Sequence, residues 1–98
     1  MHGQINKITA VPEHRAALQE LLLTGIDEMP GCLSYIVSAD TSDANVLWVT
    51  EVWDSERSQE ASLEVPAIKQ AIAAAMPMIA GFDRIATVSP VGGTGLGA

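Results

Sequence analysis

Residues 46–53, with the sequence VLWVTEVW, constrain the fold of this chain more than any other segment, because they are rich in β-formers and apolar at both strand parities. Successive side chains of a strand point to opposite faces, so Trp48 and Val52 share one face while Val49 and Trp53 share the other. Leaving either face in water would forfeit a large part of a small domain's stability. The segment therefore predicts a sheet covered by helices on one face and by a second subunit on the other, in a homodimer packed sheet to sheet.

The length and charge of the chain limit what it can be. Its 98 residues allow one hydrophobic core and are too few for two independent domains. Apolar residues make up 48% of the chain and charged residues 17%, a composition typical of a folded protein. The net charge of −7 repels phosphate backbones and anionic lipid surfaces, so we expect neither nucleic acid nor a membrane as a partner.

Cysteine and histidine are too scarce for a disulfide or a zinc centre. Cys32 is the only cysteine, and His2 and His14 are the only histidines, so we predict no internal disulfide and no metal site. The longest uncharged run, residues 70–82, is shorter than the roughly 20 residues that a membrane helix needs. The N-terminus lacks the basic start and apolar stretch of an export signal, and we expect a reducing, cytoplasmic location.

Hydrophobic periodicity and turn residues divide the chain into strands and helices. The expected strands are residues 4–9, 32–38, 46–53 and 82–91. The expected helices are one opened by Pro12 with an apolar face through Gly25, a short one from residue 54 or 55 to 63, and one opened by Pro66 with an apolar stripe from Ile68 to Ile79. Pro77 is expected to distort that last helix or to end it early.

This order of elements matches an α+β, ferredoxin-like split βαβ plan, in which helices cover one face of a four-stranded antiparallel sheet. We expect residues 1–91 to form this single domain. Residues 92–98, GGTGLGA, are glycine-rich enough to form a flexible tail. No helix follows them, so they do not indicate a phosphate-binding loop.

Five short stretches resemble the antibiotic biosynthesis monooxygenase (ABM) family: GCLSY at 31–35, WVTEVWDS at 48–55, ASL at 61–63, IAGF at 79–82 and PVGG at 90–93. The resemblance implies a dimeric α/β barrel made of two ferredoxin-like protomers, with a pocket between the sheet and the helices of each. It also implies membership of a family that includes oxygenases acting on quinols and aromatic polyketides without metal or flavin, and a branch that degrades haem.

The chain departs from the family at its histidines. Its NKIT segment at 6–9 resembles strand one of the haem branch, but the Trp position of that branch falls on Ser62 and its His position on Ile72. Other members place a His at the position of Ser62 or of Gln59. An isoleucine cannot ligate iron through a ring nitrogen, so haem degradation by that route is not expected. Any acid–base catalyst must be a carboxylate, Tyr35 or the substrate itself.

Three polar side chains are the predicted catalytic residues. Asn6 offers a donor and an acceptor to a quinol oxygen, Tyr35 offers a hydroxyl to an oxyanion, and Arg84 can steady a phenolate. Arg84 has a simpler interpretation as a surface partner of Asp83 or Glu51. A buried Glu51 must be paired or have a raised pKa, and we expect a salt bridge.

The predicted substrate-binding residues are chosen for shape. Trp53 can stack on an aromatic ring, although core packing or a dimer contact is the simpler explanation. The remaining binding candidates are Gln59, Ser62, Ile72 and Met76. By strand parity at most one of the two tryptophans can line a given pocket.

The residues and the resemblance together suggest a cofactor-independent monooxygenase that oxidises a quinol or a polycyclic, polyketide-like aromatic with O₂. The alternative is a non-catalytic dimer that binds a small aromatic ligand, and a haem or flavin binder is a further alternative. These hypotheses differ in whether purified protein consumes oxygen with an aromatic substrate.

Overall fold

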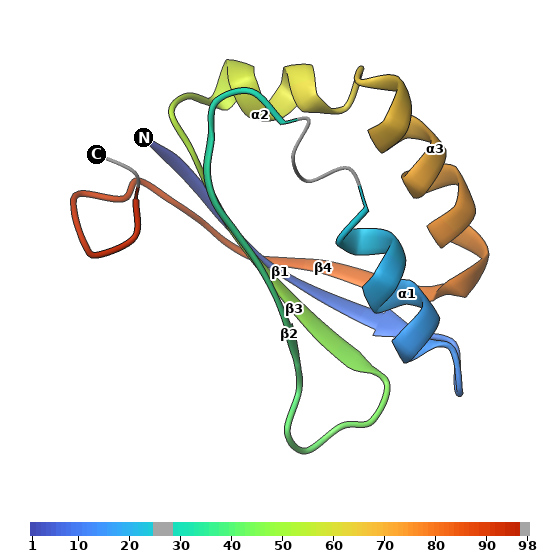
Figure 1. Cartoon of the computed structure of the whole chain (residues 1–98). Coiled ribbons are helices and arrows are strands. Elements are labelled where there is room, and N and C mark those ends of the chain that lie inside the picture. The colour runs from blue at the N-terminus through green and yellow to red at the C-terminus, as the bar shows by residue number, and fades with distance from the viewer. Residues whose placement is uncertain (25–28, 97–98) are drawn as a thin grey trace.

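The computed structural model describes residues 1–24 and 29–96, and its elements follow the predicted order (Figure 1). The strands are β1 (His2–Ala10), β2 (Cys32–Ala39), β3 (Val46–Trp53) and β4 (Ile79–Val88). The helices are α1 (Arg15–Leu22), α2 (Glu56–Ser62) and α3 (Pro66–Ala75), followed by the 3₁₀ turn η2 (Met76–Met78). The predicted α+β ferredoxin-like fold is confirmed.

The four strands form one antiparallel sheet in the order β2-β3-β1-β4. The register places Asn6 of β1 opposite Val49 of β3 on one side and opposite Arg84 of β4 on the other. Pairing between β1 and β4 shifts between Ile5 and Asn6, so Ile85 has no partner opposite it in β1. The central strands β1 and β3 therefore carry many of the buried side chains of the molecule.

The helices lie together on one side of the sheet (Figure 1). On the other side a row of paired residues crosses all four strands, formed by Ile36, Thr50, Ile5 and Ala86. Ile36 is 54% exposed, which is high for an isoleucine in a strand. Within the described residues, this face has no helix to cover it.

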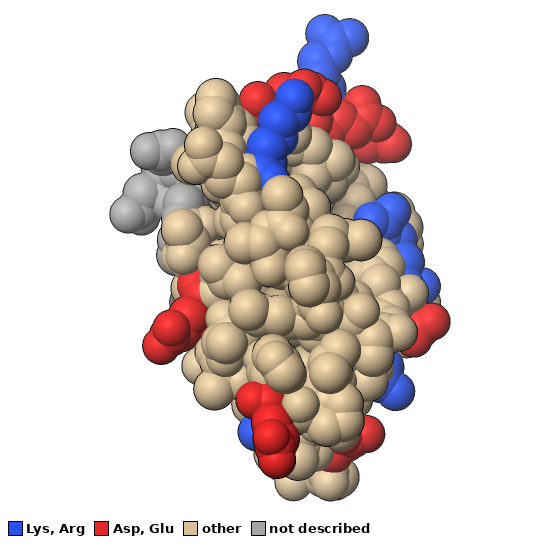
Figure 2. All heavy atoms as spheres, turned by 90° about the vertical axis from the view of Figure 1, so that its right-hand side faces the viewer, with Lys and Arg blue, Asp and Glu red and all other residues tan. Residues whose placement is uncertain are grey.

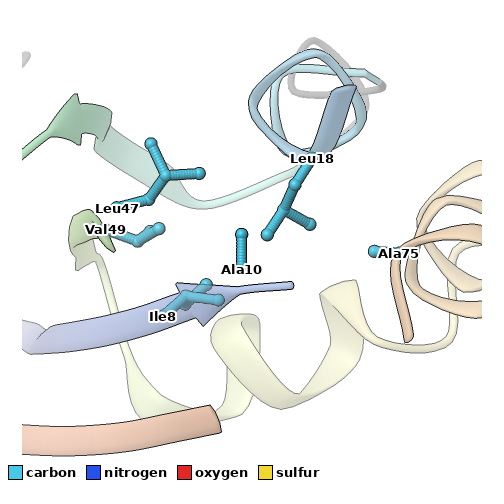
Figure 3. Packing of buried hydrophobic residues seen from close by; sticks show 6 residues of the cluster. All are labelled: Ile8, Ala10, Leu18, Leu47, Val49 and Ala75. Carbon is cyan, nitrogen blue, oxygen red and sulfur yellow. The ribbon is translucent and has the colours of Figure 1, made fainter. Parts of the chain in front are cut away.

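The hydrophobic core lies where β1 and β3 meet α1 and α3. Leu18 of α1 and Leu47 of β3 are completely buried, and Ile8 of β1 and Ala75 of α3 pack with them. Figure 3 shows these side chains pointing toward one another from four different elements. Burial of this cluster fixes α1 and α3 against one end of the sheet.

The first helix begins later than predicted. α1 starts at Arg15 rather than at Pro12. Glu13 has a φ of 72°, in the left-handed region that a helix cannot include, and the backbone N–H of His14 donates to the carbonyl oxygen of Val11 at 3.0 Å. The chain therefore turns tightly before the helix begins. The predicted end of the apolar face at Gly25 lies outside the described residues.

The last helix and strand also meet at a different residue. Ile79 was predicted on the helical stripe, but it is the first residue of β4, which ends at Val88 rather than at residue 91. α3 ends at Ala75 because Pro77 cannot donate a helical hydrogen bond, as predicted, and the 3₁₀ turn η2 takes its place. The spacing of four residues between Ala75 and Ile79 therefore does not reflect a continuous helix.

The helical side of the molecule is poor in charge. In Figure 2, which faces the side formed by α1 and α3, uncharged residues fill the centre and charged side chains lie near the margins. Within the described residues, no helix has the length and apolar character needed to cross a membrane.

Candidate functional site

A cavity of about 330 Å³ lies between the helix-covered face of the sheet and the helices. The strands supply most of its polar lining, which includes Gln4, Asn6, Tyr35, Glu51 and Arg84. The helices contribute mainly apolar side chains, among them Leu21, Ile68, Ile72 and Ala75. The cavity is thus an apolar chamber with a polar floor.

The polar floor follows from strand alternation and register. Glu51 of β3 pairs with Gln4 of β1 on one side and with Tyr35 of β2 on the other, so the three side chains stand in a row across neighbouring strands. Asn6 lies two residues along β1 from Gln4 and therefore faces the same way. Gln4 and Asn6 are each 4% exposed and Glu51 is 8% exposed. Buried polar groups gathered in this way need partners or a function.

Glu51 is the buried carboxylate of the floor. Its Oε1 accepts a hydrogen bond from the indole Nε1–H of Trp53 at 2.9 Å. Burial raises the pKa of Glu51, while the indole hydrogen bond and the positive charges of Arg84 and His2 offset part of that rise. The carboxyl group is therefore more easily protonated than an ordinary glutamate.

Tyr35 is held as a neutral hydroxyl. Burial raises the pKa of Tyr35 strongly, and its ionisable neighbours Glu51 and Cys32 raise it further. The phenol therefore keeps its proton throughout the neutral range. Tyr35 can donate a hydrogen bond to an oxyanion in the cavity, but it cannot serve as a base there.

Asn6 and Arg84 form a pair across the β1–β4 interface. The Nε–H of Arg84 donates to Oδ1 of Asn6 at 3.2 Å. This contact orients the side-chain amide, because the oxygen faces Arg84 and the NH₂ group remains as the end that can meet a ligand. The amide NH₂ of Asn6 is the part of the side chain that the contact with Arg84 leaves free to donate, with the guanidinium beside it.

The helix wall places four of the predicted binding residues at the cavity. Ser62 of α2 donates its hydroxyl hydrogen to the carbonyl oxygen of Gln59 at 2.6 Å, so that donor is already used within the helix. Ile72 of α3 is 43% exposed and Met76 of η2 is 60% exposed, although both line the cavity. These half-exposed apolar residues indicate that the chamber opens to solvent beside α3 and η2.

All eight predicted site residues line this one cavity: Asn6, Tyr35, Trp53, Gln59, Ser62, Ile72, Met76 and Arg84. Trp53 is only 1% exposed, so its ring has little free surface for a ligand and mainly forms a packed wall that anchors Glu51. Trp48 lies on the opposite face of the sheet, as parity predicted, and its Nε1–H donates to Oδ1 of Asp40 at 2.8 Å. The roles of the eight residues remain predictions.

Two predicted ion pairs are wrong. Arg84 donates to the neutral side chain of Asn6 rather than pairing with Asp83 or Glu51. Glu51 accepts from the indole of Trp53 and has no salt bridge within the described residues. The partners differ because the register, which short-range sequence patterns do not reveal, brings a neutral acceptor to Arg84 and a neutral donor to Glu51.

The sequence interpretation missed Gln4 and undervalued Glu51 as site residues. Both signals were present in the alternation of the strands: Gln4 has the same parity as Asn6, and Glu51 has the same parity as Trp53. Phe82 was also missed, although it pairs with Ile8 in the register and lines the cavity while 52% exposed. A polar residue that points to the same face of a strand as a proposed site residue is therefore itself a candidate site residue.

The lining does not fit haem held through histidine. Among the residues that line the cavity in the described part of the chain there is no histidine, and Ile72 occupies the position of the haem branch's histidine. Over residues 1–24 and 29–96, no three His, Cys, Asp or Glu side chains are grouped closely enough to hold a metal ion. We therefore derive no step through haem or a metal centre.

A ferredoxin-like fold with a cavity between its sheet and helices defines the class of protein. Residues 1–74 match the family model described as antibiotic biosynthesis monooxygenase. The chain belongs to the ABM family, and the resemblance noted from its short sequence stretches is confirmed. Among proteins with curated functions, none matches the chain.

Solved structures support the same assignment. A candidate antibiotic biosynthesis monooxygenase from Chloroflexus aurantiacus is 47% identical, with 98% of each chain covered and a TM-score of 0.94. A second candidate from Deinococcus radiodurans is 28% identical, with 95% of each chain covered and a TM-score of 0.77. A third, from Caulobacter crescentus, is 22% identical over 93% of this chain and 90% of that chain, and its TM-score of 0.82 shows the fold alone.

Proposed function

We propose that this protein is a cofactor-independent monooxygenase that oxidises a quinol or a polycyclic, polyketide-like aromatic with O₂. The observation that carries the proposal is the division of the cavity into an apolar chamber and a polar floor of Gln4, Asn6, Tyr35 and Glu51. A flat aromatic ring suits the chamber, and its phenolic oxygens suit the floor. The volume of about 330 Å³ is at the small end of the range for ligand pockets, roughly 300–1,000 Å³.

The proposed reaction needs no external reductant. A hydroquinone and O₂ give a hydroxyquinone and water, so one oxygen atom enters the ring and the other leaves as water. An anthrone and O₂ similarly give an anthraquinone and water, because oxidation of the CH₂ group to a carbonyl supplies all four electrons. In each case the deprotonated substrate passes one electron to O₂ and the two radicals combine, while the protein holds the anion and excludes water.

Three donors stabilise the substrate anion in this proposal. The amide NH₂ of Asn6, the hydroxyl of Tyr35 and the guanidinium of Arg84 all line the cavity, and all three can donate to an oxyanion. Tyr35 is suited to this because it stays protonated beside the negative charge of Glu51. Trp53, Gln59, Ser62, Ile72 and Met76 shape the walls around the ring.

Oxygen uptake tests the proposed function. Purified protein is mixed with 1,4-naphthohydroquinone or 1,8-dihydroxyanthrone, and uptake is measured above the rate without protein. We expect catalysed uptake that falls roughly 10²-fold in Asn6→Ala, which removes one donor to the anion. The non-catalytic binder is the second candidate because the described cavity lining holds no histidine. Binding of both probes, with uptake no faster than that of Asn6→Ala, would favour it.

We also propose that the protein acts as a homodimer through the uncovered face of its sheet. The row of Ile36, Thr50, Ile5 and Ala86 is mostly apolar, and Ile36 is 54% exposed on it. A second copy packed on this face removes that surface from water.

Light scattering tests the dimer with a matched pair of variants. Ile36→Glu places a charge on the uncovered face and is expected to yield monomer at concentrations where the wild type is dimeric. Leu23→Glu changes an isolated hydrophobic residue near the end of α1, 42% exposed, and is expected to leave the dimer intact. A wild-type protein that is monomeric at micromolar concentration would contradict the proposal.

A further inference from the structure

We propose that Glu51 is the general base of this cavity, which takes the first proton from the substrate, and that Trp53 is the positioning residue that holds it. The inference rests on the proposed function and adds to it the group that starts the reaction. It answers a question that the family resemblance leaves open, because the positions where relatives carry a histidine hold Gln59, Ser62 and Ile72 in this chain.

Elimination among the lining residues points to Glu51. Of the described residues that line the cavity, three have ionisable side chains: Tyr35, Glu51 and Arg84. Arginine stays protonated in proteins and cannot accept a proton. Tyr35 also keeps its proton at neutral pH, because burial and its charged neighbours raise its pKa. Glu51 is the remaining ionisable group of the lining, and its carboxylate can accept a proton.

The geometry of the carboxylate leaves one oxygen for this task. Oε1 accepts the indole N–H of Trp53 at 2.9 Å, which fixes the plane of the group. Among the described residues, no hydrogen-bond donor reaches Oε2. A base must reach the proton that it abstracts, and the position of Glu51 on the cavity lining allows Oε2 to meet a bound substrate.

The neighbours of Glu51 suit a base rather than a fixed anion. Tyr35 and Cys32 lie on the β2 side, His2 and Gln4 on the β1 side, and Arg84 on β4. The described parts of the helices contribute no charged side chain to the lining. Arg84 lowers the pKa of Glu51 but forms no ion pair with it, so the carboxylate keeps its capacity to accept a proton.

The step balances without any further reagent. With a hydroquinone bound, the phenolic O–H bond breaks and an O–H bond forms at Oε2 of Glu51. The electron pair stays on the phenolic oxygen, which becomes a quinolate that Tyr35 and Asn6 can stabilise. The electrons for O₂ come from this quinolate, and the proton on Glu51 leaves with the water that the reaction releases.

The test compares substitutions of Glu51 in oxygen uptake with 1,4-naphthohydroquinone, measured as kcat/KM against pH. Glu51→Gln keeps the size of the side chain and can still accept from Trp53, but it cannot take a proton. We expect it to lower kcat/KM about 10²-fold or more and to remove the acid limb of the pH profile. Glu51→Asp should restore part of the rate. Glu60→Gln, the same change on the exposed surface of α2, is the matched control and should leave the rate unchanged.

Trp53→Phe tests the positioning role. Loss of the indole hydrogen bond should move the acid limb to higher pH, because that bond lowers the pKa of Glu51. A purely structural tryptophan would change the rate without moving the limb.

The outcomes separate this inference from the proposed function. Turnover by the wild type together with an unchanged rate and profile in Glu51→Gln would overturn the inference and leave the function standing. Absence of turnover by the wild type with both the quinol and the anthrone would overturn the function, and the role of Glu51 with it. A folded Glu51→Gln variant is verified by its thermal transition, which is expected at or above that of the wild type.

Discussion

At one end of the space between the sheet and the helices, Ala10, Leu18 and Leu47 fill the interior, whereas at the other end Gln4 and Glu51 border a cavity of about 330 Å³. Both ends are built from the same two strands, β1 and β3, a few residues apart. The packed end has the density that stabilises a small domain. The polar end buries groups that an apolar core would exclude.

The contrast between the packed end and the polar end identifies the polar end as the less stabilising part of the fold. A buried carboxylate costs free energy unless it is paired with a charge, and Glu51 has only the neutral indole of Trp53 as its hydrogen-bond partner among the described residues. Buried ionisable groups of this kind are typical of functional sites, where a destabilising group is retained for its chemistry. The packed end must therefore supply stability that the polar end does not.

The largest expected effect is at the packed end. Leu18→Ala removes a completely buried side chain and should lower the free energy of unfolding by about 2–5 kcal/mol. Ile72→Ala, at the 43% exposed rim of the cavity, should cost no more than about 1 kcal/mol. Urea denaturation of both variants measures the contrast. Equal losses at the two positions would show that the cavity is as tightly packed as the core.

The loop that precedes β2 should give the next largest effect. Gly31 has a φ of 84°, and a Cβ atom there would lie 2.6 Å from the Oγ of Ser58 and 2.7 Å from the Oδ1 of Asp54. Gly31→Ala should therefore cost about 2 kcal/mol, from the left-handed backbone and the two close contacts together. A matched control is Gly92→Ala, where nothing lies within 4 Å of the added atom. If Gly31→Ala lost no more stability than Gly92→Ala, the described conformation of the loop at Gly31 would be contradicted.

The third effect is a gain in stability that depends on pH. Below the pKa of the unfolded carboxyl, Glu51 is protonated in both states, and Glu51→Gln should match the wild type. As pH rises, the unfolded state releases its proton first, so the wild type loses stability until pH passes the raised pKa of the folded state. At pH 7 to 8 the variant should be the more stable protein, by about 1.4 kcal/mol for each unit of that rise.

Thermal or urea unfolding at several pH values measures this difference. A variant that becomes less stable than the wild type as pH rises would mean that the ionised carboxylate stabilises the fold. In that case the polar end would resemble the packed end in its contribution to stability.

Much of the fold could be predicted because it depends on local pattern. Alternation in residues 46–53 predicted that Trp48 and Trp53 lie on opposite faces of the sheet, although not which of them lines the cavity, and Pro77 ended α3 as expected. The start of α1 could not be predicted, because the left-handed conformation of Glu13 has no signal in its residue type. Ile79 was misassigned because its spacing continued a helical stripe past a proline.

The candidate site was less predictable than the fold. Strand parity groups Asn6, Tyr35 and Trp53 on one face only once the order of the strands is known. The contacts that define their chemistry, from Arg84 to Asn6 and from Trp53 to Glu51, depend on register and side-chain orientation. The first joins residues 78 positions apart, a distance over which sequence patterns carry no information about geometry.

The proposed role of Glu51 requires a carboxyl group at the polar end of the sheet that can take up and release a proton. A titration by ¹³C NMR of the side-chain carboxyl of Glu51, with its signal assigned by its loss in Glu51→Gln, tests this most directly. We predict a pKa above the ordinary value of 4.5. A pKa at or below that value would show a permanently ionised, structural carboxylate and would contradict the account.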